Sequence, residues 1–268
     1  MTPDRLFLAS LTLFLFGSLG ASLPLLMRAR ISPLTLSRAN AFSGGVLLGA
    51  GLIHLLGDAV AGFARAYPGL DYPAAYAIAT TTFLVVLAIE RVVPRGLSSP
   101  AHAGGDPEAS ALVGSMAGAG STPYVLLATL SIHSIIAGAA LGTETDRSAF
   151  LVLLAAILAH KASAGFALGT TFERAGASFR QALPALLFFA GSTPVGVLLG
   201  AVAGIGFDAG HLQVATAWFK AVAAGTFVYI AVLDVVREEF FPAERDVLGR
   251  YVCALLGAGV MATLALWM

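Results

Sequence analysis

The sequence predicts an all-α integral membrane protein with eight transmembrane helices. Of its 268 residues, 58% are hydrophobic and only 11% are charged, and the mean hydropathy is +0.87. Apolar runs of roughly 20 residues, the length that crosses a bilayer as a helix, also recur along the whole chain. We therefore expect residues 1–268 to form a single transmembrane domain in contact with membrane lipid.

The spans follow one another between charged breaks or breaks rich in Pro and Gly. The first run is too long for the apolar core of a signal peptide and has no clear cleavage site, so we interpret it as a span. The predicted spans are 5–27, 40–62, 73–94, 123–143, 148–171, 181–204, 212–236 and 247–267. The long connection 95–122 is rich in Gly, Ser, Ala and Pro, which predicts a flexible loop with His102 solvated in it.

Basic residues collect in alternate connections. Ten of the 15 Lys and Arg residues lie in connections on one side of the predicted membrane, and three lie on the other side. Short cytoplasmic loops carry the excess of Lys and Arg, so we expect a cytoplasmic 95–122 loop and both termini outside. The expected location is a bacterial inner (plasma) membrane.

Composition also excludes several classes of function. The net charge is zero and the chain has no basic run, which argues against a nucleic-acid partner. The single cysteine, Cys253, can build neither an intrachain disulfide nor a cysteine-based metal site.

An eleven-residue segment occurs twice, in two consecutive predicted spans. HSIIAGAALGT begins at His133 and HKASAGFALGT at His160, and seven positions are identical. At about 1.5 Å per residue, both histidines reach the bilayer midplane from opposite sides. We therefore expect spans 4 and 5 to form a pseudo-twofold inverted pair. The glycines spaced four apart in each copy give each helix a face of small residues for close approach.

Ionisable groups inside spans are costly, so each is a functional hypothesis. His133 and His160 are predicted to be a ligand pair for Zn²⁺ or a similar ion, the alternative being histidines that bond a carbonyl. His54 and Asp58, four residues apart on one helix face, are predicted to lie on the ion pathway, with a structural or capping role as the alternative.

Five further ionisable residues have weaker predictions. Glu90, Asp234 and Glu238 lie near the inner ends of spans 3 and 7, where they either line an exit or are interfacial charges near arginines. Lys161 is too deep to reach the membrane surface, so we expect a fixed charge that faces the helix bundle. Lys220 is expected to extend its ammonium to the membrane surface.

The two copies resemble the signature segments of the ZIP (Zrt-, Irt-like protein) family of divalent-metal transporters. GGVLLGAGLIHLLGD in span 2, STPVGVLLG in span 6, AAGTFVYIAVLD in span 7 and Glu90 in span 3 also resemble this family. The resemblance implies movement of zinc or another divalent cation toward the cytoplasm, through a site between spans 4 and 5.

The resemblance also implies which residues hold the metal. His133, Ser134 and His160 match ligand positions, and Lys161 matches a position where some relatives have a second-metal ligand. Relatives commonly have Glu at the places of Ala137 and Ala164, so this chain lacks both carboxylates. Because no negative charge offsets a dication there, we expect weaker binding than in acidic relatives.

The leading interpretation is a zinc-like cation transporter, not an enzyme, with no cofactor and with glycine-rich faces that permit a homodimer. Since ligation requires neutral imidazole, we expect uptake to fall below about pH 6.5. One alternative is a degenerate member of the same fold that acts as a sensor, a partner or a carrier of another solute. Another alternative is an intramembrane metallohydrolase. The motifs argue against it because they contain no carboxylate that could act as general base.

Overall fold

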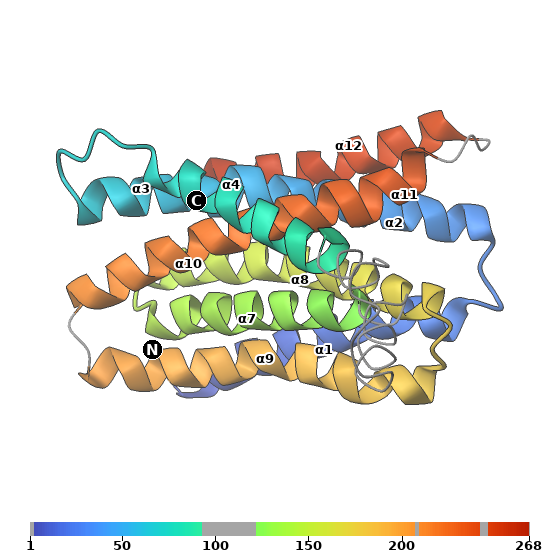
Figure 1. The fold of residues 1–268 in the computed structure, drawn as a ribbon. Coiled ribbons are helices and arrows are strands. Elements are labelled where there is room, and N and C mark those ends of the chain that lie inside the picture. Colours follow the sequence, from blue (N-terminus) through green and yellow to red (C-terminus); the bar gives the residue numbers. More distant parts are fainter. Residues whose placement is uncertain (1–2, 93–121, 207–208, 242–245, 268) are drawn as a thin grey trace, which may run out of the picture.

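The computed structural model of the chain describes residues 3–92, 122–206, 209–241 and 246–267. Within these residues every regular element is helical, and the long helices run along a common direction with both termini at one end of the bundle (Figure 1). The predicted loop 95–122 lies outside the described residues, except for Thr122, with which a helix begins.

The helices follow the apolar runs. Several of them extend past these runs into polar residues. Seven helices of the described residues are long and apolar enough to cross a membrane, and Ala74–Glu90 is a shorter apolar helix. The predicted all-α membrane protein with about eight spans is therefore confirmed. In chain order the elements are α1 (Pro3–Met27), α2 (Pro33–Gly49), η1 (Ala50–Leu55), α3 (Leu56–Ala66), α4 (Ala74–Leu87), η2 (Ala88–Val92), α7 (Thr122–Thr143), α8 (Arg147–Arg174), α9 (Phe179–Gly206), α10 (Ala209–Tyr229), η4 (Ile230–Val236), α11 (Arg237–Phe240), α12 (Val247–Leu264) and η5 (Ala265–Trp267).

Within the part of the chain that the structure describes, three spans contain a π-helical segment. These segments are η1, η2 and η4, and they carry His54, Glu90 and Asp234 respectively. A π-helical turn inserts one extra residue, is rare, and is found frequently at functional sites. Three of the ionisable residues singled out in the sequence thus lie where the helix departs from regular geometry.

The glycines of the repeated segment bring two helix pairs into backbone contact. On α7, a Cβ added at Gly142 would lie 2.2 Å from the carbonyl oxygen of Val197 in α9. On α8, a Cβ added at Gly169 would lie 2.2 Å from the carbonyl oxygen of Ala21 in α1. The same face of small residues therefore packs α7 against α9 and α8 against α1.

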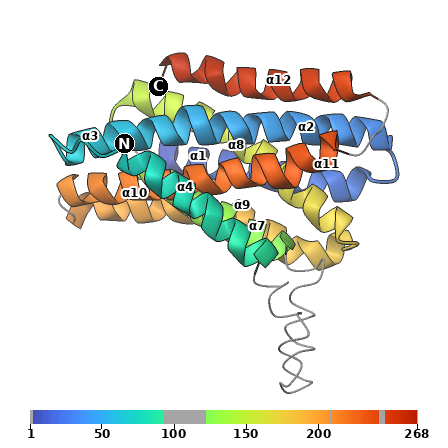
Figure 2. The same cartoon turned by 45° about the horizontal axis from the view of Figure 1, so that its top comes forward.

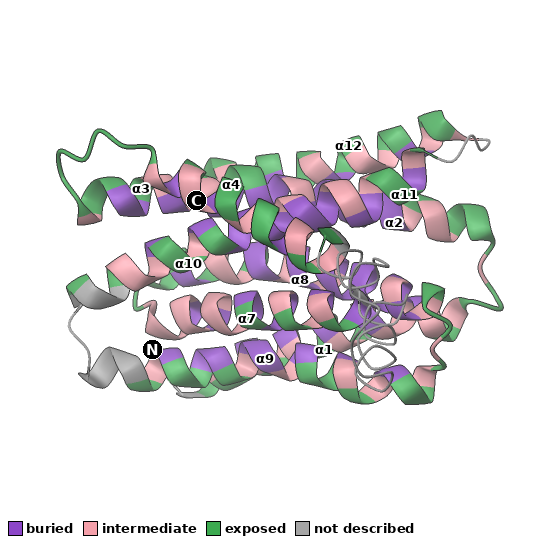
Figure 3. Ribbon diagram, viewed as in Figure 1, coloured by how far each residue is buried: buried purple, intermediate pink, exposed green. Residues whose placement is uncertain are grey.

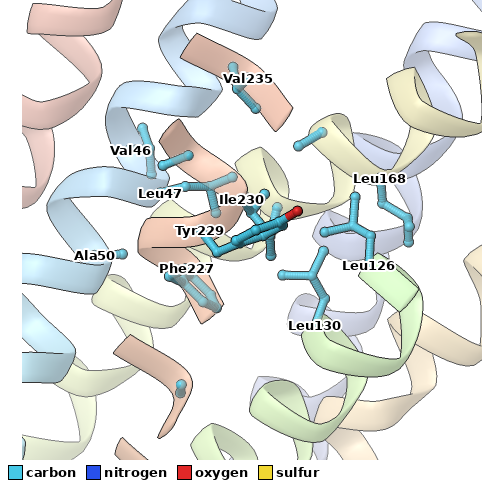
Figure 4. Packing of buried hydrophobic residues seen from close by; sticks show 14 of the residues in the cluster. Val46, Leu47, Ala50, Leu126, Leu130, Leu168, Phe227, Tyr229, Ile230 and Val235 are labelled. Carbon is cyan, nitrogen blue, oxygen red and sulfur yellow. The ribbon is translucent and has the colours of Figure 1, made fainter. Parts of the chain in front are cut away.

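The remaining long helices pair in a corresponding way, α2 with α12 and α10 with α4. Figure 2 shows α12 at the edge of the bundle beside α2. The core between the two sets of helices is built around the fully buried Tyr229 and Phe227 of α10. Leu47 of α2, Leu130 of α7 and Leu168 of α8 pack near them (Figure 4).

Large apolar side chains cover much of the outer surface. Phe7 of α1, Leu198 of α9 and Leu248 of α12 are among those more than 60% exposed, and exposed stretches are visible along α9 and α12 (Figure 3). Such a surface suits contact with lipid chains and not with water. Together with the apolar spans, it defines an integral membrane protein.

Candidate metal centre

Three histidines from three helices meet inside the bundle. His54 comes from η1, His133 from α7 and His160 from α8, and their exposed fractions are 6%, 5% and 3%. The ring centroids of His133 and His160 lie 5.6 Å apart, and those of His54 and His160 lie 6.2 Å apart. The predicted pair of facing imidazoles is thus brought together, with a third imidazole beside it.

These separations suit imidazoles that share one ion. With metal-to-nitrogen distances of about 2.0–2.1 Å, two imidazoles on a tetrahedral ion have centroids about 5 Å apart, and about 6.5 Å apart when they lie opposite each other. Among the described residues, no three His, Cys, Asp or Glu side chains are already arranged to hold one ion. A bound metal would therefore need a small rearrangement of the histidines, or water as a further ligand.

The imidazoles lack the hydrogen bonds that buried polar groups normally make. Both ring nitrogens of His133, and Nδ1 of His54 and of His160, have no hydrogen-bond partner. Phe227 packs edge-on against the ring of His133 at a centroid distance of 4.5 Å and offers it no acceptor. A buried polar atom without a partner costs free energy, so such a group calls for an explanation, for example an ion or water. Neutral imidazole nitrogen is a ligand that zinc, iron and copper accept.

A small cavity lies between the three histidines. Its volume is about 20 Å³, and Ala140 of α7 and Lys220 of α10 also line it. A space of roughly 10–15 Å³ is enough for one water molecule, so this cavity suits a single water or a single ion. No carboxylate is among its lining residues.

Lys161 lines a second small space together with His133 and His160, but its ammonium is held by other groups. Nζ donates to the carbonyl oxygen of Phe189 at 2.8 Å and to Oγ of Ser134 at 3.0 Å, and it lies 3.8 Å from the centroid of the Phe189 ring. Lys161 is only 2% exposed. The ammonium is therefore held within the bundle, where it engages a lone pair of the Ser134 hydroxyl.

The two alanines at the positions where the family resemblance implies carboxylates, Ala137 and Ala164, lie at the site. Ala137 lines the histidine cavity, and both Ala137 and Ala164 line the second small space beside Ser134 and Lys161. A carboxylate at Ala137 would therefore reach the imidazoles, and its absence leaves the site with uncharged donors only.

Asp58 lies one helical turn beyond His54 and has two basic neighbours. Its Oδ2 is 3.5 Å from Nδ1 of His54 and 2.6 Å from Nζ of Lys220. The contact with His54 is too long or poorly aligned to count as a hydrogen bond, since Nδ1 has no such partner.

The prediction that Lys220 extends its ammonium to the membrane surface is wrong, because the ammonium is paired with Asp58. Its pairing with Asp58 could not be predicted from the sequence, because the two residues are 162 positions apart.

The three predicted exit carboxylates do not line the histidine cavity. Glu90 accepts a hydrogen bond from the hydroxyl of Tyr229 at 3.0 Å. Asp234 is 9% exposed in η4, and Glu238 pairs with Arg174.

Sequence analysis missed the most buried carboxylate of the described chain, Glu239. It is 3% exposed and accepts hydrogen bonds from Ser37, from Asn40 at 2.9 Å and from Arg174 at 2.5 Å. Arg250 donates to its backbone carbonyl at 2.6 Å. The sequence analysis selected the neighbouring Glu238 instead, although Glu239 is the buried residue of the two.

A helical membrane bundle with buried, unpartnered imidazoles facing one another defines an integral membrane protein with a candidate site for a transition-metal ion. Comparison with known proteins agrees with this class. A family model described as ZIP Zinc transporter matches residues 102–265, which is more than half of the chain. The chain therefore belongs to the ZIP family.

Similar proteins cover most of the chain. Zinc transporter ZIP1 of Mus musculus is 29% identical over 85% of this chain and 78% of its own length. Zinc transporter ZIP2 of Mus musculus is 28% identical over 87% of this chain and 85% of its own length. Zinc transporter 5 of Oryza sativa subsp. japonica is 28% identical over 85% of this chain and 76% of its own length.

Proposed function

We propose that the protein transports a divalent transition-metal ion, zinc or a similar cation, toward the cytoplasm through a site between α7 and α8. The observation that carries this proposal is the pair of buried imidazoles, His133 and His160, at a separation suited to one ion. Both ring nitrogens of His133 and Nδ1 of His160 lack hydrogen-bond partners. The names of the relatives, which are zinc transporters, support the choice of cargo.

In this proposal each residue around the site has a role. Asp58 and His54 pass the ion inward, and His133, Ser134 and His160 hold it near the bilayer midplane. Lys161 supplies a fixed positive charge that keeps a second cation out. Glu90, Asp234 and Glu238 receive the ion on the cytoplasmic side, where most of the arginines are expected to lie.

The packing of the helices supports alternating access as the mechanism. His133 and His160 belong to the helices that pack as α7 with α9 and α8 with α1, whereas His54 belongs to the α2 span that pairs with α12. The ligand set is therefore divided between two groups of helices. A shift of one group relative to the other would move His133 and His160 past His54 and expose the ion to the opposite side.

Zinc uptake into proteoliposomes of purified protein tests the proposal. We expect His133→Ala combined with His160→Ala to lower the initial rate of uptake by at least about 100-fold, because loss of groups that merely orient metal ligands already costs about 10- to 100-fold. His102→Ala, which removes a histidine predicted to lie outside the spans, is the matched control and retains uptake. Uptake by the double variant at the wild-type rate would overturn the proposal.

A second candidate function rests on the absence of a carboxylate among the residues that line the histidine cavity. A chain with only uncharged donors could have lost transport and kept the fold as a sensor or as the carrier of another solute. Ala137→Glu distinguishes the two. No uptake by the wild type and measurable uptake by this variant would favour the degenerate function, whereas wild-type uptake would exclude it.

A further inference from the structure

We propose that Lys220 is a tethered cation that occupies the carboxylate of Asp58 at the entrance to the histidine site, and that a divalent metal ion must displace it to enter. This inference rests on the proposed function, because it concerns the same path. It makes Lys220 a specificity-determining residue, and the class of ligand it selects is a divalent cation.

The position of Lys220 between two cavities supports this role. A polar cavity of about 420 Å³ lies between α3, α7 and α10, and Asp58, Arg65 and Glu144 are among its lining residues. Lys220 and Ala140 are the two residues that line both this cavity and the histidine cavity. A cation that passes from one cavity to the other therefore passes the Lys220 ammonium.

The ammonium is bonded to the acceptor that an incoming metal would use. Lys220 Nζ lies 2.6 Å from Oδ2 of Asp58, and the same oxygen is the one nearest to Nδ1 of His54. Asp58 is thus the carboxylate through which an ion in the polar cavity could reach the first imidazole. While Lys220 holds this oxygen, the step from cavity to histidine is closed.

Charge decides which ions can displace the ammonium. A monovalent cation gains about the same Coulomb energy from Asp58 as the ammonium already has, whereas a divalent cation gains about twice as much. A dication on Asp58 also repels Lys220 twice as strongly. The other charges that line the polar cavity, Arg65 and Glu144, are one of each sign, so the cavity itself offers little net attraction to cations.

When it is displaced from Asp58, the Lys220 ammonium can move into the polar cavity, where another carboxylate lies. Its side chain is 23% exposed and the Asp58 side chain 35% exposed, so the pair is accessible from the polar cavity. Glu144 and the polar side chains of Thr143 and Gln213 line the same cavity. The flexible four-carbon stem of lysine allows the ammonium to move toward them.

Zinc titration of purified protein by calorimetry tests this inference without requiring transport. We expect Lys220→Gln to lower the zinc concentration for half-saturation by about fivefold, the effect of removing a competing partner of moderate strength. Lys220→Arg keeps the cation and should stay within about twofold of the wild type. In an Asp58→Asn background, Lys220→Gln should change half-saturation little, because the contested carboxylate is gone.

Arg65→Gln is the matched control for a general effect of charge, because Arg65 lines the polar cavity but not the histidine cavity. An equal shift in Arg65→Gln and Lys220→Gln would overturn the inference, as would unchanged half-saturation in Lys220→Gln. Failure of the proposed function is a separate result, namely wild-type uptake after loss of both His133 and His160. If the wild type bound no zinc, both would fall.

Discussion

The bundle contains two clusters of buried polar side chains that differ in how their hydrogen bonds are satisfied. In the histidine cluster, four ring nitrogens of His54, His133 and His160 have no partner. In the Glu239 cluster, Asn40 and Arg174 donate to the carboxylate and Arg250 donates to the backbone carbonyl. The imidazoles thus lack partners within the protein, whereas the Glu239 carboxylate has several.

This difference separates a binding role from a structural role. A complete buried network stabilises the fold and breaks at high cost when one partner is removed. A cluster without partners costs stability, and a bound ion or water that supplies the missing partner would offset that cost. The contrast predicts that substitutions in the two clusters act in opposite directions on stability.

Glu239→Ala should have the largest effect on stability. Removal of the buried carboxylate leaves Asn40 and Arg174 without their acceptor, so we expect the free energy of unfolding to fall by about 3 kcal/mol. Glu238→Ala is the matched control, because the Glu238 side chain is 49% exposed and should change stability by less than about 1 kcal/mol. Denaturant titration in detergent measures both, and equal losses would erase the contrast between the clusters.

Zinc should stabilise the protein through the histidine cluster. A ligand that binds only the folded state at about 100 times its dissociation constant adds roughly 2.7 kcal/mol. We expect zinc to raise the melting temperature of the wild type and of Glu238→Ala, but not that of a variant with both His133→Ala and His160→Ala. A zinc-dependent rise that persists in the double variant would place the ligand elsewhere.

His133→Leu should stabilise the metal-free protein. The substitution replaces two unpartnered ring nitrogens by an apolar side chain, which removes a desolvation cost of about 1 kcal/mol. We therefore expect a higher melting temperature without zinc and no further rise when zinc is added. A clear loss of stability would mean that His133 has a structural role, as the hydrogen-bonded alternative requires.

The smallest effect is expected at Asp246, at the edge of the Glu239 cluster. Arg38 donates a hydrogen bond to Asp246 at 2.6 Å, and this contact holds the pKa of the Asp246 carboxyl below its usual value. Its contribution is complete at neutral pH and is lost as the pH falls through the lowered pKa. Between about pH 6 and about pH 3, we expect the wild type to lose slightly more stability than Asp246→Asn.

Asn suits this test because Asp246 has a positive φ of 76°, which Asn also tolerates. Melting temperatures measured at both pH values in low salt make the comparison. Parallel curves for the two proteins would show that the Arg38 contact contributes nothing.

Much of the fold could be predicted because the membrane imposes it. Runs of about 20 apolar residues must become helices in lipid, and the repeated segments placed His133 and His160 at similar depths in antiparallel spans. His54 approaches His160, which is consistent with the predicted role of span 2 in the ion pathway. The π-helical turn that carries His54 has no signal in the apolar periodicity of the sequence.

Contacts between distant segments could not be predicted in this way. Lys220 pairs with Asp58 across 162 residues, and Asn40 reaches Glu239 across 199. Apolar periodicity shows which residues enter the membrane but not which helix they face, so the partner of a buried charge depends on helix packing. For the same reason Glu239, and not the more exposed Glu238, became the centre of the charged cluster.

The glycine contacts of α7 and α8 indicate that part of the repeated segment serves helix packing. Gly138, Gly142, Gly165 and Gly169 all approach the backbone of a neighbouring helix, and Leu141 and Leu168 are fully buried. Three of the seven identities between the two copies thus serve helix packing, while the identical histidines are the ones to which we assign metal binding. A descendant could lose its cargo and still display a convincing signature, so annotation of distant homologues should depend on the first letter of the segment.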